Sequence, residues 1–152
     1  MQWVKDLFAN DCLMIVSLSW FTAQFLKFLI NILIRKKVRF ERLYGSGGMP
    51  SAHTAFVSSL VMAVARVEGV TSTYFVLAFA LAAVVIYDAM GVRRQAGEHA
   101  KVLNKIIDSE DYLRNEVDDD DDYELKELLG HTPLEVLGGA MVGILVSMLY
   151  QI

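Results

Sequence analysis

The chain has 152 residues, 55% of them apolar, and its mean hydropathy is positive. This favours one membrane domain over residues 1–152 rather than a set of soluble domains. The net charge of −4 comes from a single acidic stretch, residues 108–127, which includes five consecutive aspartates; the rest is basic and apolar. The only cysteine, Cys12, excludes an internal disulfide and a cysteine-only metal site.

Four apolar segments have the length of membrane-crossing helices, which need about 20 mostly apolar residues. In chain order they are residues 12–34, 51–67, 73–90 and 133–152. Gly69 follows the second segment, and Thr132-Pro133 provides an N-cap and a first-turn proline for the fourth. The expected fold class is therefore all-α, an integral membrane bundle of about four transmembrane helices. Residues 108–127 are expected to form a solvated acidic loop within it.

Lysine and arginine in the short loops predict the orientation. Five basic residues follow the first segment, between positions 35 and 42, and six follow the third, between positions 93 and 126. The opposite side has only Lys5 and Arg66. Both basic regions are therefore expected in the cytoplasm, with both termini outside, in a protein of the bacterial cytoplasmic membrane.

Alternate crossing of four helices places the first and third loops on the same face. The first loop ends in Gly48-Met-Pro-Ser51-Ala-His53, and the third begins with Asp88 through Arg94 and ends at His131. We therefore expect His53, Arg93, Arg94 and His131 to meet at the cytoplasmic interface.

These residue types suit phosphate chemistry. Arginine binds phosphate oxygens as a bidentate fork, and glycine-rich turns before helix N-termini present N–H groups to an anion. Two histidines can act as nucleophile and proton donor. No step requires a metal or a cofactor.

Three blocks of the sequence resemble a known family. Pro50-Ser51-Ala52-His53 is similar to the Pro-Ser-Gly-His motif of the type 2 phosphatidic acid phosphatases, membrane lipid phosphatases related in fold to vanadium haloperoxidases. His131-Thr-Pro-Leu-Glu135 resembles their His-x-x-x-Asp motif. Residues 47–51, 87–94 and 128–133 look more closely like the divergent branch of that family, and the resemblance runs from about Gln24 to the C-terminus without the acidic loop.

The resemblance implies a role for each matching residue. His131 would be the nucleophile, Glu135 would orient it, and His53 would be the general acid. Ser51 and the backbone at Gly48 would contact phosphate. The implied substrate is a phospholipid or isoprenoid phosphate in the membrane, and no nucleic acid is expected as a partner.

Two parts of the family pattern are missing. The first motif, a Lys followed after six intervening residues by Arg-Pro, has no match, and Lys27 is its nearest candidate. The arginine expected six positions before the nucleophile is replaced by Leu125, so Arg93 or Arg94 must take its place. Most relatives also have more than four helices, which favours a homodimer.

Several of these residues have structural interpretations as well. Thr132-x-x-Glu135 is a capping box, which is compatible with a catalytic role for Glu135. Ser51 also fits a helix N-cap. Charges inside a membrane segment are costly unless paired or functional, so Lys27 is expected to pair with Asp88, to snorkel or to reach phosphate.

The predicted function is a metal-independent membrane phosphatase acting on a lipid or isoprenoid phosphate through a phosphohistidine. The alternative is a non-catalytic membrane protein that binds a phosphate or lipid headgroup. A CDP-alcohol phosphotransferase ranks below both, because its metals need several spaced aspartates and only Asp88 lies in that region.

Overall fold

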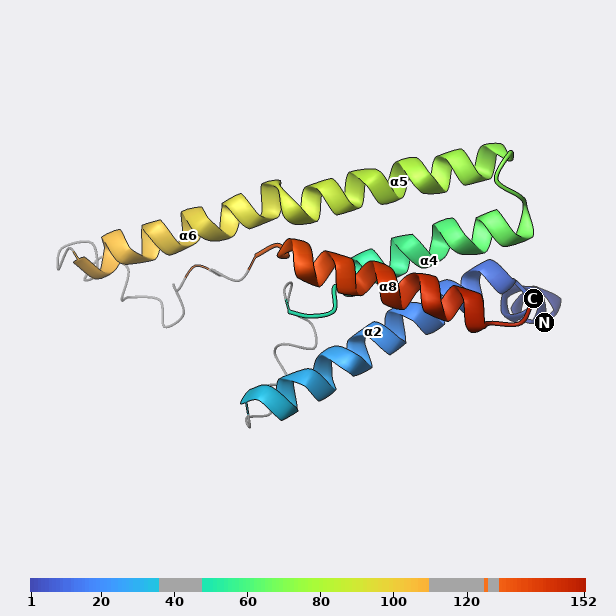
Figure 1. Ribbon diagram of the computed structural model, residues 1–152, viewed down its shortest axis with the longest axis horizontal. Coiled ribbons are helices and arrows are strands. Elements are labelled where there is room, and N and C mark those ends of the chain that lie inside the picture. Colours follow the sequence, from blue (N-terminus) through green and yellow to red (C-terminus); the bar gives the residue numbers. More distant parts are fainter. Residues whose placement is uncertain (36–47, 110–124, 126–128) are drawn as a thin grey trace.

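A computed structural model of the protein describes residues 1–35, 48–109, 125 and 129–152, and within these ranges the regular structure is entirely helical. Both chain termini lie at the same end of the bundle (Figure 1). The helices, in chain order, are α1 (Gln2–Phe8), α2 (Asp11–Arg35), α4 (Ala52–Val67), α5 (Thr73–Met90), α6 (Val92–Ser109) and α8 (Pro133–Leu149).

The four predicted apolar helices are confirmed as α2, α4, α5 and α8, with boundaries within three residues of those expected. Two stretches, Asp11–Leu33 and Thr73–Ile107, are long and apolar enough to cross a membrane, and α4 and α8 are shorter apolar helices. Large apolar side chains such as Phe79 and Leu137 remain more than half exposed on the outside of the bundle. That arrangement is the one expected when lipid is the surrounding solvent. The protein is an all-helical membrane bundle.

Helix α4 lies at the centre, in contact with α2, α5 and α8. Its closest partner is α8, and small residues make the approach possible. A Cβ atom at Gly139 would overlap the carbonyl oxygen of Ser51, and one at Gly143 would overlap the carbonyl oxygen of Ala55. Small residues of this kind let membrane helices pack backbone to backbone. Helix α4, which carries His53, and helix α8, which begins two residues after His131, are therefore held at minimal separation.

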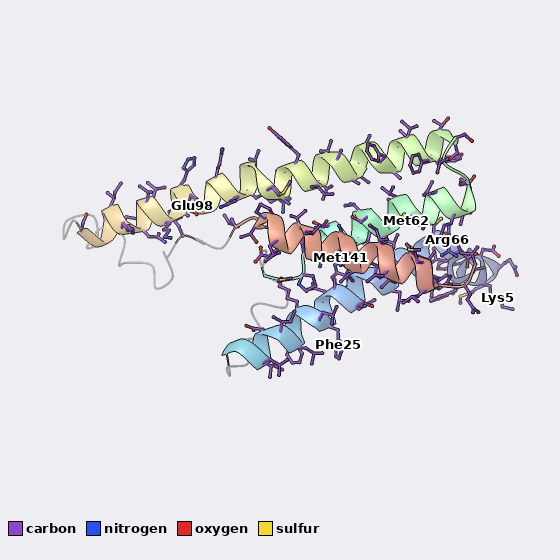
Figure 2. The ribbon with its side chains drawn as sticks, in the orientation of Figure 1. Lys5, Phe25, Met62, Arg66, Glu98 and Met141 are labelled. Atoms are coloured by element: carbon purple, nitrogen blue, oxygen red, sulfur yellow. The ribbon has the colours of Figure 1, made fainter. Side chains whose placement is uncertain are left out.

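Hydrogen bonds between the helices add to this packing. The hydroxyl of Ser147 donates to the carbonyl of Ser59, and that of Ser19 donates to the carbonyl of Ala55, each at 3.1 Å. At the end near the termini, Arg66 donates to the carbonyl oxygens of Ser147 and Tyr150 (Figure 2). These bonds give the last carbonyl groups of α8 a partner.

The sequence predicts a loop after Met90, and this prediction is wrong for residues 92–109. Helix α6 continues from α5 as an almost collinear rod (Figure 1). Apolar residues recur with helical spacing within it, at Val92, Ala96 and Leu103, which favours a helix here. The two helices are separated at Gly91, whose φ of −99° and ψ of −95° are not helical. Of the predicted acidic loop, residues 108 and 109 belong to α6, and 110–124 and 126–127 lie outside the described residues.

Candidate functional site

The first turns of α4, α6 and α8 meet at the end of the bundle opposite the termini. The N–H of Ser51 donates to the carbonyl of Glu135 at 2.9 Å, which joins the start of α4 to the start of α8. The N–H of His131 donates to the carbonyl of Ala89, also at 2.9 Å, which joins the approach to α8 to the end of α5. Each helix N-terminus carries a partial positive charge. Because the end of α5 lies directly before α6 and offsets that charge, the starts of α4 and α8 are the two that favour an anion.

Two histidines face each other at this point. The ring centroids of His53 and His131 are 6.1 Å apart, with the rings edge to face. His131 is buried, with 4% of its surface exposed, whereas His53 is exposed in the first turn of α4. A nucleophile needs to be about 3–3.5 Å from the atom it attacks, and a proton donor about 2.6–3.2 Å from its acceptor. The distance between the two rings is therefore suitable for a phosphoryl group that lies between them, with one histidine close to the phosphorus atom and the other close to the leaving oxygen.

The surroundings of His131 keep its imidazole neutral. Burial lowers its pKa below the ordinary value of 6.5, and the positive charges of Lys27 and Arg93 lower it further, whereas the carboxylate of Glu135 acts in the opposite direction. Its Nδ1 atom is buried and has no hydrogen-bond partner among the described residues. A neutral imidazole keeps the lone pair that nucleophilic attack requires.

Two cations, Lys27 and Arg93, lie close enough to His131 for their charges to affect its pKa. The side chain of Lys27, from α2, runs along Gly48, and its Cε would lie 3.1 Å from a Cβ at that position. Gly48 also has a φ of +91°, so both its conformation and its contact with Lys27 favour glycine. The second cation, Arg93, comes from α6, and its Nε lies 2.6 Å from Oδ2 of Asp88. Arg94 contributes its backbone, which packs under Gly130, while its side chain is exposed.

Two of the predicted site residues take part in helix capping. Ser51 is completely buried as the N-cap of α4, and its hydroxyl oxygen accepts hydrogen bonds from the N–H and the hydroxyl of Thr54. The Glu135 carboxylate accepts a bond from the N–H of Thr132 at 2.9 Å, and the full capping box is present. Asp88 forms an ion pair with Arg93. A pair between Asp88 and Lys27 was one of the alternatives expected from the sequence.

Two features of the site were not predicted. Gly130 has a φ of +82°, and a Cβ there would overlap the backbone of Arg94, so this glycine lets the approach to His131 lie on the start of α6. The Asp88–Arg93 pair joins residues five apart, which do not share a face of a regular helix. Gly91 between them was the available signal for the break that makes the pair possible.

The fold and the site define a helical membrane protein with a histidine pair set between cationic side chains and helix N-termini. The sequence matches the Divergent PAP2 family over residues 8–146, and the chain belongs to that family. It is also similar to a protein of Bacillus subtilis (strain 168) named "Uncharacterized membrane protein YuiD", with 38% identity over 133 residues, 83% of this chain and 84% of the relative. No solved structure matches. The family resemblance expected from the three motifs is thus confirmed.

Proposed function

We propose that this protein is a membrane phosphatase that hydrolyses a lipid or isoprenoid phosphate, as a monoester or a diphosphate, through a phosphohistidine on His131. The observation that carries this proposal is the buried His131, whose lowered pKa keeps it neutral, set beside His53 at 6.1 Å between ring centroids. Membership of a phosphatase-related family supports the same reaction class.

In the first step an imidazole nitrogen of His131 attacks the phosphorus atom. The P–N bond forms while the P–O bond to the alcohol breaks, and His53 gives its proton to the departing oxygen. In the second step His53 takes a proton from a water molecule that attacks the phosphorus. The P–N bond then breaks, which releases inorganic phosphate and returns His131 to its neutral form. Both half-reactions conserve protons and need no further reactant.

The cations and the helix ends provide the binding energy for the phosphate. Arg93 and Lys27 both lie near His131, and charge-assisted hydrogen bonds to phosphate are roughly twice as strong as neutral ones. These groups are fixed before the substrate arrives and stabilise the negative charge on the transferring group, which is usually the largest catalytic contribution. The lipid part of the substrate would remain among the apolar side chains, with the site at the cytoplasmic face.

Two substrates with different leaving groups test the proposal. A lipid alkoxide needs a proton to leave, whereas p-nitrophenolate does not. Loss of general acid catalysis costs about 10²- to 10⁴-fold, so His53→Ala should lose that factor on the lipid phosphate and much less on p-nitrophenyl phosphate. His131→Ala should abolish turnover of both. The measurement is kcat/KM of each purified variant in matched detergent, with folding checked by thermal melting.

The control is His99→Ala, a third histidine that is exposed on α6; it should behave as the wild type on both substrates. A folded His131→Ala variant with near-wild-type turnover would remove the phosphohistidine mechanism. Orthovanadate, which mimics five-coordinate phosphorus, should inhibit, and EDTA should not. Loss of activity in EDTA that magnesium restores would indicate metal-dependent chemistry instead.

A second candidate is a protein that binds a phosphate headgroup without hydrolysing it. The engagement of Ser51 and Glu135 in helix caps favours this candidate, because neither side chain then has to serve the reaction. Vanadate binding without turnover of any lipid phosphate would select it over the phosphatase.

A further inference from the structure

Asp88 and Arg93 form an ion pair across the break between α5 and α6. In a regular helix, residues five apart are rotated by about 140° from each other, so their side chains point to different sides. The non-helical backbone of Gly91 removes this rotation and brings Nε of Arg93 to 2.6 Å from Oδ2 of Asp88. The pair therefore exists only because the helix is interrupted at Gly91.

Asp88 is badly placed to stabilise the helix that carries it. It lies in the last turn of α5, where the helix dipole disfavours a negative charge. The side chains of Arg93 and Asp88 are 52% and 38% exposed, respectively, and ion pairs with that much exposure contribute little to folding stability. The helix dipole and the stability of the ion pair therefore do not explain a carboxylate at this position. Its effect on the position of the Arg93 side chain does.

The bond constrains the guanidinium group of Arg93. A guanidinium has five N–H donors in one plane, and the bond to Asp88 engages the Nε–H. The donors on the two terminal nitrogens remain for a bidentate contact with phosphate, in a plane that Asp88 holds. Such preorganisation lowers the entropy lost on binding.

We propose that Asp88 is a positioning residue that fixes Arg93 for phosphate recognition. It contacts neither the substrate nor the reacting atoms and acts entirely through Arg93. This inference rests on the proposed function to the extent that the site must bind a phosphate-like anion, but it does not require turnover.

A double-mutant cycle in the full-length protein tests this coupling, with orthovanadate as the probe and its dissociation constant measured by isothermal titration calorimetry in detergent. Asp88→Ala and Arg93→Ala should each weaken vanadate binding by about tenfold or more, the effect of losing one charge-assisted contact. Adding Asp88→Ala to Arg93→Ala should cause no further loss, because a residue that acts through Arg93 has no effect without it. Asp88→Glu should restore part of the affinity.

The matched control is Glu98→Gln, which removes one carboxylate from an exposed position on α6, distant from the bundle (Figure 2); it should leave vanadate binding unchanged. If Asp88→Ala fails to fold, as judged by thermal melting, the isosteric Asp88→Asn takes its place in the cycle. In a working phosphatase, Asp88→Ala and Arg93→Ala should each lower kcat/KM, and the double variant should lose no more than Arg93→Ala alone.

Two results would overturn the inference: wild-type vanadate affinity in a folded Asp88 variant, or losses that multiply in the double variant. A wild type that binds no vanadate would overturn it as well, together with the phosphate site. If wild type hydrolyses no phosphate ester but its vanadate binding follows the cycle, the proposed function fails and the role of Asp88 is supported.

Discussion

The backbone N–H of His131 donates to the carbonyl oxygen of Ala89 at 2.9 Å. The preceding residue, Gly130, lies on the backbone of Arg93 and Arg94 so closely that a Cβ would overlap it. The candidate nucleophile is therefore held against the junction of α5 and α6 by main-chain contacts. Because the same junction carries Arg93, the relative position of nucleophile and cation depends on backbone packing at one glycine.

Replacement of Gly130 tests this dependence. Gly130→Ala places a Cβ at a φ of +82° and in overlap with Arg94, so the segment must shift; the left-handed conformation alone costs about 1–2 kcal/mol. We expect a lower melting temperature and a loss of kcat/KM of about 10²-fold, the order of effect that a misplacement of about 1 Å produces.

A second glycine of the same region gives the control for Gly130. A Cβ at Gly138 would meet mainly the flexible side chain of Met49, with its Cε at 3.3 Å. Gly138→Ala should therefore retain activity. Equal losses of activity in the two variants would show that the contact between Gly130 and α6 has no special role.

The lowered pKa of His131 predicts the pH dependence. Protonation removes the lone pair of the nucleophile, so kcat/KM should fall as the pH decreases through the pKa of His131, which burial and nearby cations place below 6.5. Lys27→Met removes one of those cations, so the acidic limb should move to higher pH. Ring NMR titration of His131 in a His99→Gln background separates this pKa from ionisation of the substrate. An acidic limb at or above 6.5 in the wild type would contradict the prediction.

The capping box allows the two roles of Glu135 to be separated. Glutamine can replace glutamate in such a box, so Glu135→Gln should melt near the wild type. It lacks the negative charge that favours the cationic imidazole of His131, which is the form that carries the phosphoryl group. We expect a lower kcat from this variant. Thr132→Ala removes the N-cap and should cost about 1 kcal/mol of stability. Unchanged kinetics in Glu135→Gln would leave Glu135 with a capping role alone.

The topology is tested by labelling single cysteines in a Cys12→Ala background. Met49 and Ser109 lie toward the predicted cytoplasmic side, and Val70, which is 64% exposed, lies between α4 and α5 at the other side. In intact cells a membrane-impermeant maleimide should label a cysteine at Val70 only. Reaction of the Met49 and Ser109 cysteines from opposite sides would separate the two loops and rule out a shared site.

Much of the fold could be predicted because membrane helices are specified by local composition. The bounds of α5, Thr73–Met90, agree with the apolar segment itself, and α2 extends the predicted 12–34 by one residue at each end. Helix α6 was not predicted because its residues are mostly polar and charged and do not form an apolar segment. The helical spacing of Val92, Ala96 and Leu103 was the signal that could have indicated it.

The proximity of the two candidate histidines could be predicted from the sequence, but the contacts around them could not. Connectivity alone predicted that His53 and His131 would lie on one face, and their rings are 6.1 Å apart. The pairing of Asp88 with Arg93 was not predicted. Gly91 indicated a break between the two residues, but not the backbone angles that bring their side chains together. The burial of Ser51 likewise depends on how closely Gly139 lets α8 approach α4.

The unequal helix lengths have a consequence for the surrounding bilayer. Helices α4 and α8 have 16 and 17 residues, or about 24–26 Å at 1.5 Å per residue, which is less than the roughly 30 Å of a bilayer's hydrocarbon core. Helix α2, with 25 residues, exceeds it. Lipid adapts to a short span by local thinning. We therefore expect the bilayer to be thinner beside α8, which would bring lipid headgroups closer to the histidines. Beside α2 the bilayer should keep its normal thickness.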